Sequence, residues 1–301
     1  MGTISELGYL GVGVSDVKAW HDIATSIFGM QVVPGDNKAT SYLRLDAFHH
    51  RLELHANGGD DLEFAGWEVP DAETLDAVAG QLEKAGVKVA VGSRDEADQR
   101  RVIGLIRCVD PAGIPTEIFF GRPVNPVPFY PSRATSGFKT EGEGLGHIVI
   151  QVPDLDASVR FYRDLLGFRI SDFTDVQTPG GMLRLAFLHC NTRHHSIAFA
   201  QVPGSSKRLN HIMFEGNSLN DVGTGRDLCL ARGVPVVVDL GVHMNDRIVS
   251  FYMGSPSGFA LEYGWGARTI NEATWQTEHY SSIDSIWGHP QLRSLMNDGR
   301  R

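Results

Sequence analysis

The chain has 301 residues, of which 42% are hydrophobic and 21% charged, and its formal net charge is −9 at pH 7. This balance is typical of a globular protein with a sizeable core, and the length suits one large or two ordinary domains. The acidic charge excludes broad nucleic-acid binding, because no basic stripe is present to displace phosphate counterions, and no apolar run approaches the ~20 residues of a membrane span.

The first predicted elements form a unit that the chain repeats. Residues 7–33, LGYLGVGVSDVKAWHDIATSIFGMQVV, indicate an apolar strand, an Asp-bearing turn, an amphipathic helix ending at Gly29 and another strand. Residues 145–171, LGHIVIQVPDLDASVRFYRDLLGFRIS, indicate the same succession, and Gly167 is expected to cap the second helix where Gly29 caps the first. The pattern predicts two related halves.

The following segments extend the repeat in the same order. LRLDAFHHRLELHA resembles AFLHCNTRHHSIAFA, LEFAGWEVPDAETLDAVAGQLEKAGVKV parallels LNHIMFEGNSLNDVGTGRDLCLARGVPV, and DPAGIPTEIFFG parallels SPSGFALEYGWG. Each half therefore consists of two predicted strand–helix–strands modules. The hinge is expected in the Pro-, Gly- and Ser-rich residues 121–138, which gives domains over 1–135 and 136–301. The patterns weaken after Gly266, and this tail is expected to pack as an appendage.

The cysteines and the first residues indicate the compartment. Cys108, Cys190 and Cys229 are widely spaced and form no Cys-x-x-Cys pair, which is typical of reduced, mostly buried thiols. The first residues, MGTISELGYLGVGV, lack the basic start and apolar core of a signal peptide. We therefore expect a cytoplasmic protein.

The repeat also shows which positions serve one half only. Tyr9 stands where the second half has His147, and Phe64 stands where it has His211. An aromatic ring thus satisfies packing at both positions. The two histidines need a reason other than packing.

His147, His211 and Glu262 each lie in an apolar predicted strand, and only the glutamate has an identical counterpart, Glu117, in the first half. A buried carboxylate requires a cation or hydrogen-bond donors. Two neutral imidazoles and one carboxylate on one face of a metal leave positions open for oxygen chemistry at non-haem Fe(II). Zinc accepts the same ligands, and a purely structural role for each side chain is the alternative.

Three more side chains are expected close to this set, namely His195, His243 and Tyr252. The turn GSPSG should bring Tyr252 beside Glu262 across a hairpin. A phenol can hydrogen-bond an oxygen at a metal, and an imidazole can move protons near neutral pH. The alternatives are an ordinary strand tyrosine and an ordinary loop histidine. His194 should point to the opposite face and have a structural role.

These segments resemble a known family. LGHIVIQV, CNTRHHSIAFA, RLNHIMFE and the run from Gly241 to Glu262 are similar to the two-domain type I extradiol dioxygenases of the vicinal oxygen chelate superfamily, above all those acting on 2,3-dihydroxybiphenyl and 1,2-dihydroxynaphthalene. The resemblance covers nearly the whole chain and departs at Ser255, in a turn. It implies an α+β fold in which the two βαβββ modules of each domain form an open mixed-sheet barrel around a cavity.

The resemblance also implies an activity and a cofactor. The activity is extradiol (meta) cleavage of a catecholic substrate such as 2,3-dihydroxybiphenyl by Fe(II) and O2, with both oxygen atoms incorporated, in bacterial aromatic degradation. His147, His211 and Glu262 would bind Fe(II), with Mn(II) less favoured, and His195 would be the acid–base catalyst. A homo-oligomer, such as an octamer, is implied as well.

Catalytic roles are implied for Tyr252 and His243 beside His195, together with a set of substrate-binding residues. The side chains implied to contact the catecholic hydroxyls, support the loop around them or line the pocket are His243, Tyr252, Asn245, Asp246, Phe187 and Ile148.

Two other functions stay open on the sequence. One is another metal-dependent enzyme of the superfamily, such as a glyoxalase-like isomerase, in which His195, His243 and Tyr252 would have no task. The other is a non-catalytic protein of this fold that binds a small aromatic compound and would purify without metal.

Overall fold

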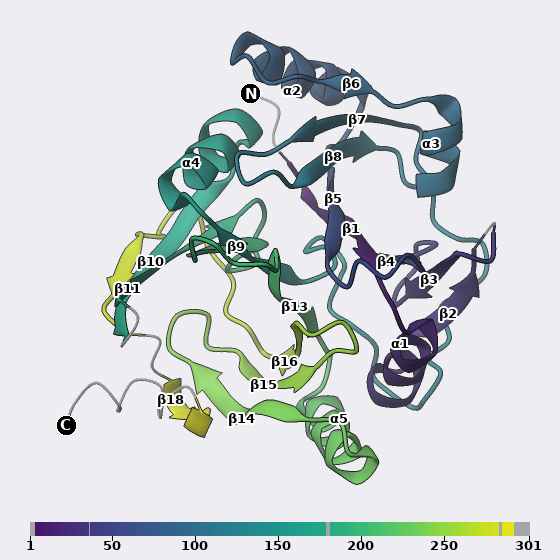
Figure 1. Ribbon diagram of the computed structural model, residues 1–301, viewed down its shortest axis with the longest axis vertical. Coiled ribbons are helices and arrows are strands. Elements are labelled where there is room, and N and C mark those ends of the chain that lie inside the picture. Colours follow the sequence, from purple (N-terminus) through teal and green to yellow (C-terminus); the bar gives the residue numbers. More distant parts are fainter. Residues whose placement is uncertain (1–3, 36, 179–180, 283–284, 292–301) are drawn as a thin grey trace.

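The computed structural model of the protein describes residues 4–35, 37–178, 181–282 and 285–291. Figure 1 shows two β-sheets side by side, one from each half of the chain, with helices on the outside. None of the helices in the described residues is both long and apolar enough to cross a membrane.

The sheet of the first half has eight strands in the order β2-β3-β4-β1-β5-β8-β7-β6. Its strands are β1 (Glu6–Gly13), β2 (Gln31–Pro34), β3 (Thr40–Arg44), β4 (Leu52–His55), β5 (Leu62–Glu68), β6 (Ala90–Val91), β7 (Gly104–Val109) and β8 (Pro115–Phe120).

The sheet of the second half has ten strands in the order β17-β10-β11-β12-β9-β13-β16-β15-β14-β18. Its strands are β9 (His147–Val152), β10 (Arg169–Thr178), β11 (Gly181–His189), β12 (Ile197–Gln201), β13 (Leu209–Glu215), β14 (Val236–His243), β15 (Val249–Gly254), β16 (Ala260–Trp265), β17 (Glu278–Tyr280) and β18 (Ser285–Gly288).

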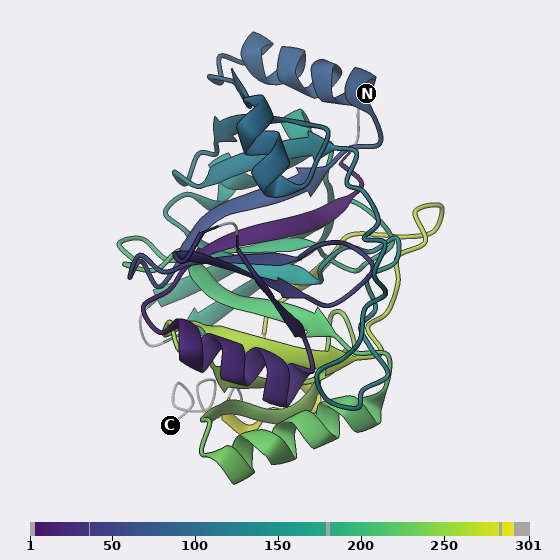
Figure 2. The ribbon, with the colours of Figure 1, turned by 90° about the vertical axis from the view of Figure 1, so that its right-hand side faces the viewer.

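Helices connect the first and second strands of each module, and α2 and α5 lie at opposite ends of the molecule (Figure 1, Figure 2). The helices and π-helical turns are α1 (Val17–Ile23), η1 (Ala24–Phe28), α2 (Ala72–Lys84), α3 (Arg94–Arg100), α4 (Leu155–Arg160), η2 (Phe161–Leu165) and α5 (Leu219–Arg232).

This element order confirms the predicted modules. In the first half they are β1-α1-β2-β3-β4 and β5-α2-β6-β7-β8, joined by antiparallel pairing of β1 with β5. In the second half they are β9-α4-β10-β11-β12 and β13-α5-β14-β15-β16, joined in the same way through β9 and β13. Each module mixes parallel and antiparallel pairs, and the sheets are open at their ends. The α+β fold of two similar halves is therefore confirmed.

The repeated local signals have the predicted structural effect in both halves. The Asp16 carboxylate accepts the Ala19 backbone N–H at 2.9 Å and caps α1, and Asp154 caps α4 in the same way. Gly29 and Gly167 both have a φ of +78°, in the left-handed region where glycine carries no steric penalty. Each helical segment therefore ends at its glycine and turns into the next strand.

Each half packs its first helical segment on the sheet of the other half. Phe28 of η1 contacts Phe214 and Tyr263, with ring centroids 5.2 and 4.9 Å apart. Trp67 of β5 contacts Tyr162 of η2 in return, at 6.0 Å. One hydrophobic cluster consequently runs through both halves. The domain boundary at residue 135 stays a prediction.

The tail differs from the expectation of an appendage. Its strand β17 pairs with β10 and its strand β18 pairs with β14, so that both extend the sheet at its edges. His289, directly after β18, is fully buried, and its Nε2 lies 3.1 Å from the Ser250 backbone oxygen. The weak sequence pattern reflects edge strands, which need only one apolar face.

Candidate active site

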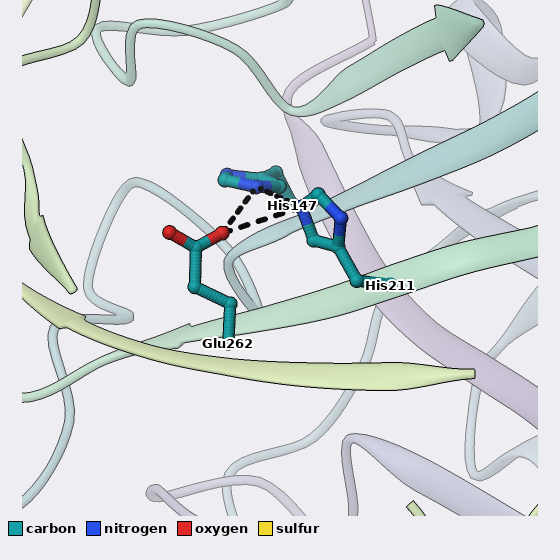
Figure 3. Close-up of side chains that lie close together, drawn as sticks. All are labelled: His147, His211 and Glu262. Carbon is teal, nitrogen blue, oxygen red and sulfur yellow. Dashed lines mark hydrogen bonds and ion pairs between the residues drawn. The ribbon is translucent and has the colours of Figure 1, made fainter. Parts of the chain in front are cut away.

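Three adjacent strands of the second sheet bring His147, His211 and Glu262 together, as Figure 3 shows. Met213 in β13 is the register partner of both His147 in β9 and Glu262 in β16. His211 lies two residues before Met213, hence with its side chain on the opposite face of β13 from Ile212. The predicted triad is thus assembled by the strand register of the repeat.

The three donor atoms form a nearly regular triangle. His147 Nε2 and His211 Nε2 are 3.1 Å apart, and Glu262 Oε2 lies 3.3 and 3.2 Å from them. Ligands bound to one ion at about 2.1 Å stand roughly 3.0 Å apart in an octahedral site and roughly 3.4 Å apart in a tetrahedral one. The observed separations fit a single metal ion between the three side chains.

Burial gives a second, independent test of that fit. Glu262 is 1% exposed, and neither of its carboxylate oxygens has a hydrogen-bond partner among the described residues. An ionised carboxylate in such a place requires a cation. Within the described residues, these three are the one group of histidine, cysteine or acidic side chains spaced to hold a metal ion.

The surroundings favour the protonation states that a metal needs. Burial lowers the pKa of His147 to about 4, although Glu262 opposes the shift. Burial alone would raise the pKa of Glu262, but the His147 and His211 rings outweigh it and hold this pKa well below its ordinary value. Neutral imidazoles and an ionised carboxylate are the forms that bind a divalent cation.

A cavity of about 400 Å³ opens beside the triad. Most of its wall surface is apolar, and polar side chains line it at the triad, in the loop after β14 and at Thr174, Tyr280 and Ser282. The apolar and aromatic lining residues include Val149, Leu183, Leu185, Phe187, Ala200, Val202, Val237, Val238 and Ala260. A largely apolar wall with the triad at one side suits an aromatic ring that carries hydroxyls on one edge.

His195 lies beside the triad, as predicted. It is 3% exposed and lines the cavity, and its ring centroid is 3.9 Å from that of His147. Its Nδ1 lies 3.1 Å from Nδ1 of His194, so Nε2 is the ring nitrogen left for the cavity. Burial lowers the pKa of His195 well below its ordinary value.

His243 and Tyr252 form a hydrogen-bonded pair on the other side of the triad. His243 Nε2 is 2.7 Å from the Tyr252 hydroxyl and 3.7 Å from Glu262 Oε1. Tyr252 is the register partner of Glu262, so the predicted approach across the hairpin is observed. Burial raises the pKa of Tyr252 well above its ordinary value and lowers that of His243, which leaves both side chains neutral.

The other predicted substrate-binding residues differ in where the structure places them. Phe187, Asn245 and Asp246 line the cavity. Asp246 also accepts a hydrogen bond from the Ile248 backbone N–H at 3.1 Å, which holds the loop after β14. Ile148 is fully buried in the hydrophobic cluster and is not among the cavity-lining residues, because alternate residues of a strand face opposite ways.

Sequence reasoning missed several residues of the cavity wall. Val149 shares the inward face of His147 at a spacing of two, a signal that could have found it. Tyr280 comes from the tail, whose pairing with β10 the sequence did not indicate. His289, which does not line the cavity itself, packs against His243 with ring centroids 4.3 Å apart and the rings tilted by 39°.

The equivalent place in the first half is filled by the protein itself. Glu117 accepts hydrogen bonds from the Tyr9 hydroxyl at 2.8 Å and from Arg100 at 2.9 and 3.0 Å. The Arg100 guanidinium also lies 3.9 Å from the centroid of the Phe64 ring. An arginine side chain thus compensates the carboxylate here, while the second half presents two histidines.

Two segments of the chain match models of known protein families. Residues 144–263 match the model described as "Glyoxalase/Bleomycin resistance protein/Dioxygenase superfamily". Residues 7–56 match "Dihydroxybiphenyl dioxygenase BphC D1".

Full-length relatives agree with both matches. A biphenyl-2,3-diol 1,2-dioxygenase of Sphingomonas paucimobilis is 43% identical, with 96% of this chain and 95% of the relative covered. A 1,2-dihydroxynaphthalene dioxygenase of Sphingobium xenophagum is 42% identical, with 96% of each chain covered. The crystal structure of a catechol 2,3-dioxygenase is 44% identical and superposes with a TM-score of 0.90, over 96% of this chain and 95% of the other.

Proposed function

Because the chain belongs to the extradiol ring-cleavage dioxygenases of the glyoxalase/bleomycin resistance protein/dioxygenase superfamily, we propose that its second half cleaves a bicyclic catecholic compound such as 2,3-dihydroxybiphenyl. In this reaction a ring carbon–carbon bond beside the diol breaks, and both atoms of O2 enter the product. The proposed setting is bacterial degradation of aromatic compounds.

The observation that carries this proposal is the buried triad at the wall of an apolar cavity. His147, His211 and Glu262 supply donor atoms 3.1 to 3.3 Å apart, and the carboxylate oxygens have no hydrogen-bond partner among the described residues. Two imidazoles and one carboxylate are the ligands of non-haem Fe(II) oxygenases. We assign Fe(II) to the triad in preference to Mn(II). Bound there, it supplies the redox chemistry between a catecholic ring and O2.

His195 is the proposed acid–base catalyst. Its Nδ1 is held by His194, and its Nε2 is the nitrogen directed at the cavity beside the triad. A neutral imidazole in this position can take up the proton that a catecholic hydroxyl loses as the ring is attacked, and return it to the oxygen that is released when the O–O bond breaks. His195 lies in a water-poor site, so a proton held at Nε2 is available mainly to the reacting oxygen.

His243 and Tyr252 are proposed to bind the catecholic hydroxyls. They are hydrogen-bonded to each other at 2.7 Å on the side of the triad away from His195, and both line the cavity. Each can exchange this hydrogen bond for one to a substrate oxygen, because hydroxyl and imidazole groups can donate or accept. Asn245 and Asp246 would shape the loop that carries His243.

The apolar part of the cavity supports a substrate with a second ring. Leu183, Leu185 and Val202 line it, and none of them offers a hydrogen-bonding group. Burying apolar surface contributes about 25 cal/mol per Å², so an added ring can improve binding by a few kcal/mol. We therefore place the diol at the triad and the distal ring against these side chains.

The decisive experiment combines oxygen uptake with visible absorbance. Anaerobically Fe(II)-loaded protein is mixed with 2,3-dihydroxybiphenyl, 1,2-dihydroxynaphthalene and 3-methylcatechol in turn, and O2 is then admitted. Uptake of one O2 per catechol with a yellow product supports the proposal, and faster turnover of the bicyclic compounds supports the substrate assignment. Absence of uptake with all three, despite bound iron, contradicts it.

The homo-oligomeric state implied by the resemblance also stays a prediction. Light scattering of the purified protein measures it directly, with an octamer as the expected assembly and a monomer as the contrary result.

A further inference from the structure

A buried carboxylate lies beside the His194–His195 doublet and is not among the residues that line the cavity. Asp172 in β10 is 1% exposed, and its Oδ2 lies 3.0 Å from Nε2 of His194, which is also 1% exposed. The two atoms are close enough for an ion pair but are not aligned for a hydrogen bond. Neither carboxylate oxygen of Asp172 has a hydrogen-bond partner among the described residues. Burying a carboxylate without hydrogen-bond partners is energetically costly, which suggests that Asp172 has a function.

His194 connects this carboxylate to the proposed catalyst. Its second nitrogen, Nδ1, is 3.1 Å from Nδ1 of His195, with the two rings nearly perpendicular at 88°. The Trp275 ring covers His194 at 5.5 Å, and the Ser171 hydroxyl donates to its backbone oxygen, so the imidazole is confined. Asp172, His194 and His195 thus form a continuous chain from the interior to the cavity wall.

The contacts between Asp172, His194 and His195 favour one tautomer of His195. The tautomer of His194 that has its proton on Nε2 directs this proton at the Asp172 carboxylate, whose Oδ2 is 3.0 Å away. Its Nδ1 is then a lone-pair acceptor, and His195 must place its own proton on Nδ1 to donate to it. The Nε2 atom of His195, which faces the cavity, is left unprotonated and held in one direction.

The first half supplies an internal comparison. His49 and His50 form the same doublet, with Nδ1 atoms 3.0 Å apart and rings at 88°. The position equivalent to Asp172, traced through the strand register, is Val33, and β2 contains no acidic residue. The doublet therefore belongs to the fold, whereas the carboxylate occurs in the half that has the metal triad.

We propose that Asp172 is a positioning residue for His195 and acts through His194. The carboxylate fixes the tautomer and orientation of His194, which in turn holds His195 Nδ1 and presents Nε2 to the reacting oxygen. This inference rests on the proposed acid–base role of His195. It also revises the purely structural role expected for His194 from the sequence.

The test compares Asp172→Asn and His194→Gln with wild type in the Fe(II)-loaded enzyme. Loss of the orienting partner should lower kcat about 10- to 100-fold. The dissociation constant of 2,3-dihydroxybiphenyl, titrated without O2, should change less than about threefold, because neither side chain lines the cavity. Asp175→Asn is the matched control, since this aspartate lies in the same strand but is exposed, and it should behave as wild type.

A double-mutant cycle decides whether the effect passes through His195. In a His195→Gln background, Asp172→Asn should lower kcat less than about threefold further. Equal losses in both backgrounds, or wild-type kcat in Asp172→Asn, would overturn the positioning role. If His195→Gln itself turns over at the wild-type rate, the proposed function of His195 fails first. Thermal unfolding identifies a misfolded variant, and in that case His194→Gln carries the same cycle.

Discussion

Glu117 and Glu262 occupy the same register position in the two halves, but what lies against each differs in charge. Glu117 is the partner of Gly66 in β5, and Glu262 is the partner of Met213 in the equivalent strand β13. A guanidinium neutralises the first, and two imidazole rings face the second. The fold therefore keeps a buried carboxylate in both halves, with a built-in cation in one and space for an added cation in the other.

This relationship predicts a large effect of Arg100→Ala on stability. Removing the guanidinium leaves the buried Glu117 with the Tyr9 hydroxyl as its one hydrogen-bond donor among the described residues, and it also removes the contact of Arg100 with the buried Glu53 at 3.1 Å. The free energy of unfolding should fall by about 3 kcal/mol. Urea titration followed by circular dichroism measures the loss. Arg94→Ala is the control, because its pair with Asp98 is exposed and should contribute less than about 1 kcal/mol.

A companion variant separates charge from packing in the first half. Adding Glu117→Gln to Arg100→Ala removes the unpaired charge, so the double variant should be more stable than Arg100→Ala alone. A double variant that is less stable than either single variant would mean that packing against Phe64 is the main contribution of Arg100.

The second half yields a prediction about metal content. Glu262→Gln removes the single anionic ligand and should weaken metal binding more than about 100-fold. Loss of a residue that only hydrogen-bonds a metal ligand typically weakens metal binding about 10- to 100-fold, and loss of a ligand should have a larger effect. Metal analysis after dialysis against a fixed free-metal concentration measures it. Glu117→Gln, the same change at the equivalent position, should retain wild-type metal content. Retention of metal by Glu262→Gln would remove the triad from consideration as the site.

The sequence could predict the triad because the repeat supplies its own alignment. His147 and His211 stand out only because Tyr9 and Phe64 occupy the same positions, and strand period then sets the shared face. The α+β class followed from the resemblance to the extradiol dioxygenases, whereas the modules followed from apolar strands, aspartate-bearing turns and the glycines at 29 and 167. These are local signals, and tertiary packing agrees with them.

Long-range contacts were not predictable in the same way. Asp172 lies in a strand of ordinary appearance, and its approach to His194 depends on how β10 pairs with β11 around an irregularity between Ile170 and Asp172. A bulge of this kind changes which face a side chain takes, and no residue type marks it. The tail residue His289 reaches His243 through edge pairing of β18, which also has no local signature.

Tyr252→Phe tests the proposed contact with a catecholic hydroxyl. It removes the hydroxyl that His243 Nε2 contacts at 2.7 Å and should lower kcat/KM about 10- to 100-fold, which corresponds to roughly 1.4 to 2.7 kcal/mol. Steady-state oxygen uptake measures it. Tyr263→Phe is the control, because the Tyr263 hydroxyl is buried without a hydrogen-bond partner among the described residues and does not line the cavity. Equal effects of the two changes would argue against a specific contact.

A pH-dependent prediction concerns Asp110, which links the halves. Its carboxylate accepts the backbone N–H groups of Ala112 and Ile114 on Oδ1 and the Tyr162 hydroxyl on Oδ2. Burial outweighs these hydrogen bonds and raises the pKa of Asp110 to about 6. Folding therefore favours its protonated form.

Because the pKa of Asp110 is raised in the folded state, wild type becomes less stable as the pH rises. Below pH ~4 the carboxyl is protonated in both states, and its contribution is fully present. Between pH ~4 and ~6 only the unfolded state ionises, so stability is lost at up to about 1.4 kcal/mol per pH unit, and above that range the loss is constant. Asp110→Asn keeps both backbone acceptor contacts and cannot ionise. In urea titrations, the unfolding free energy of Asp110→Asn should therefore increase relative to that of wild type from pH 4 to pH 6, and the difference should then level off. A difference independent of pH would mean that the three hydrogen bonds keep Asp110 ionised throughout.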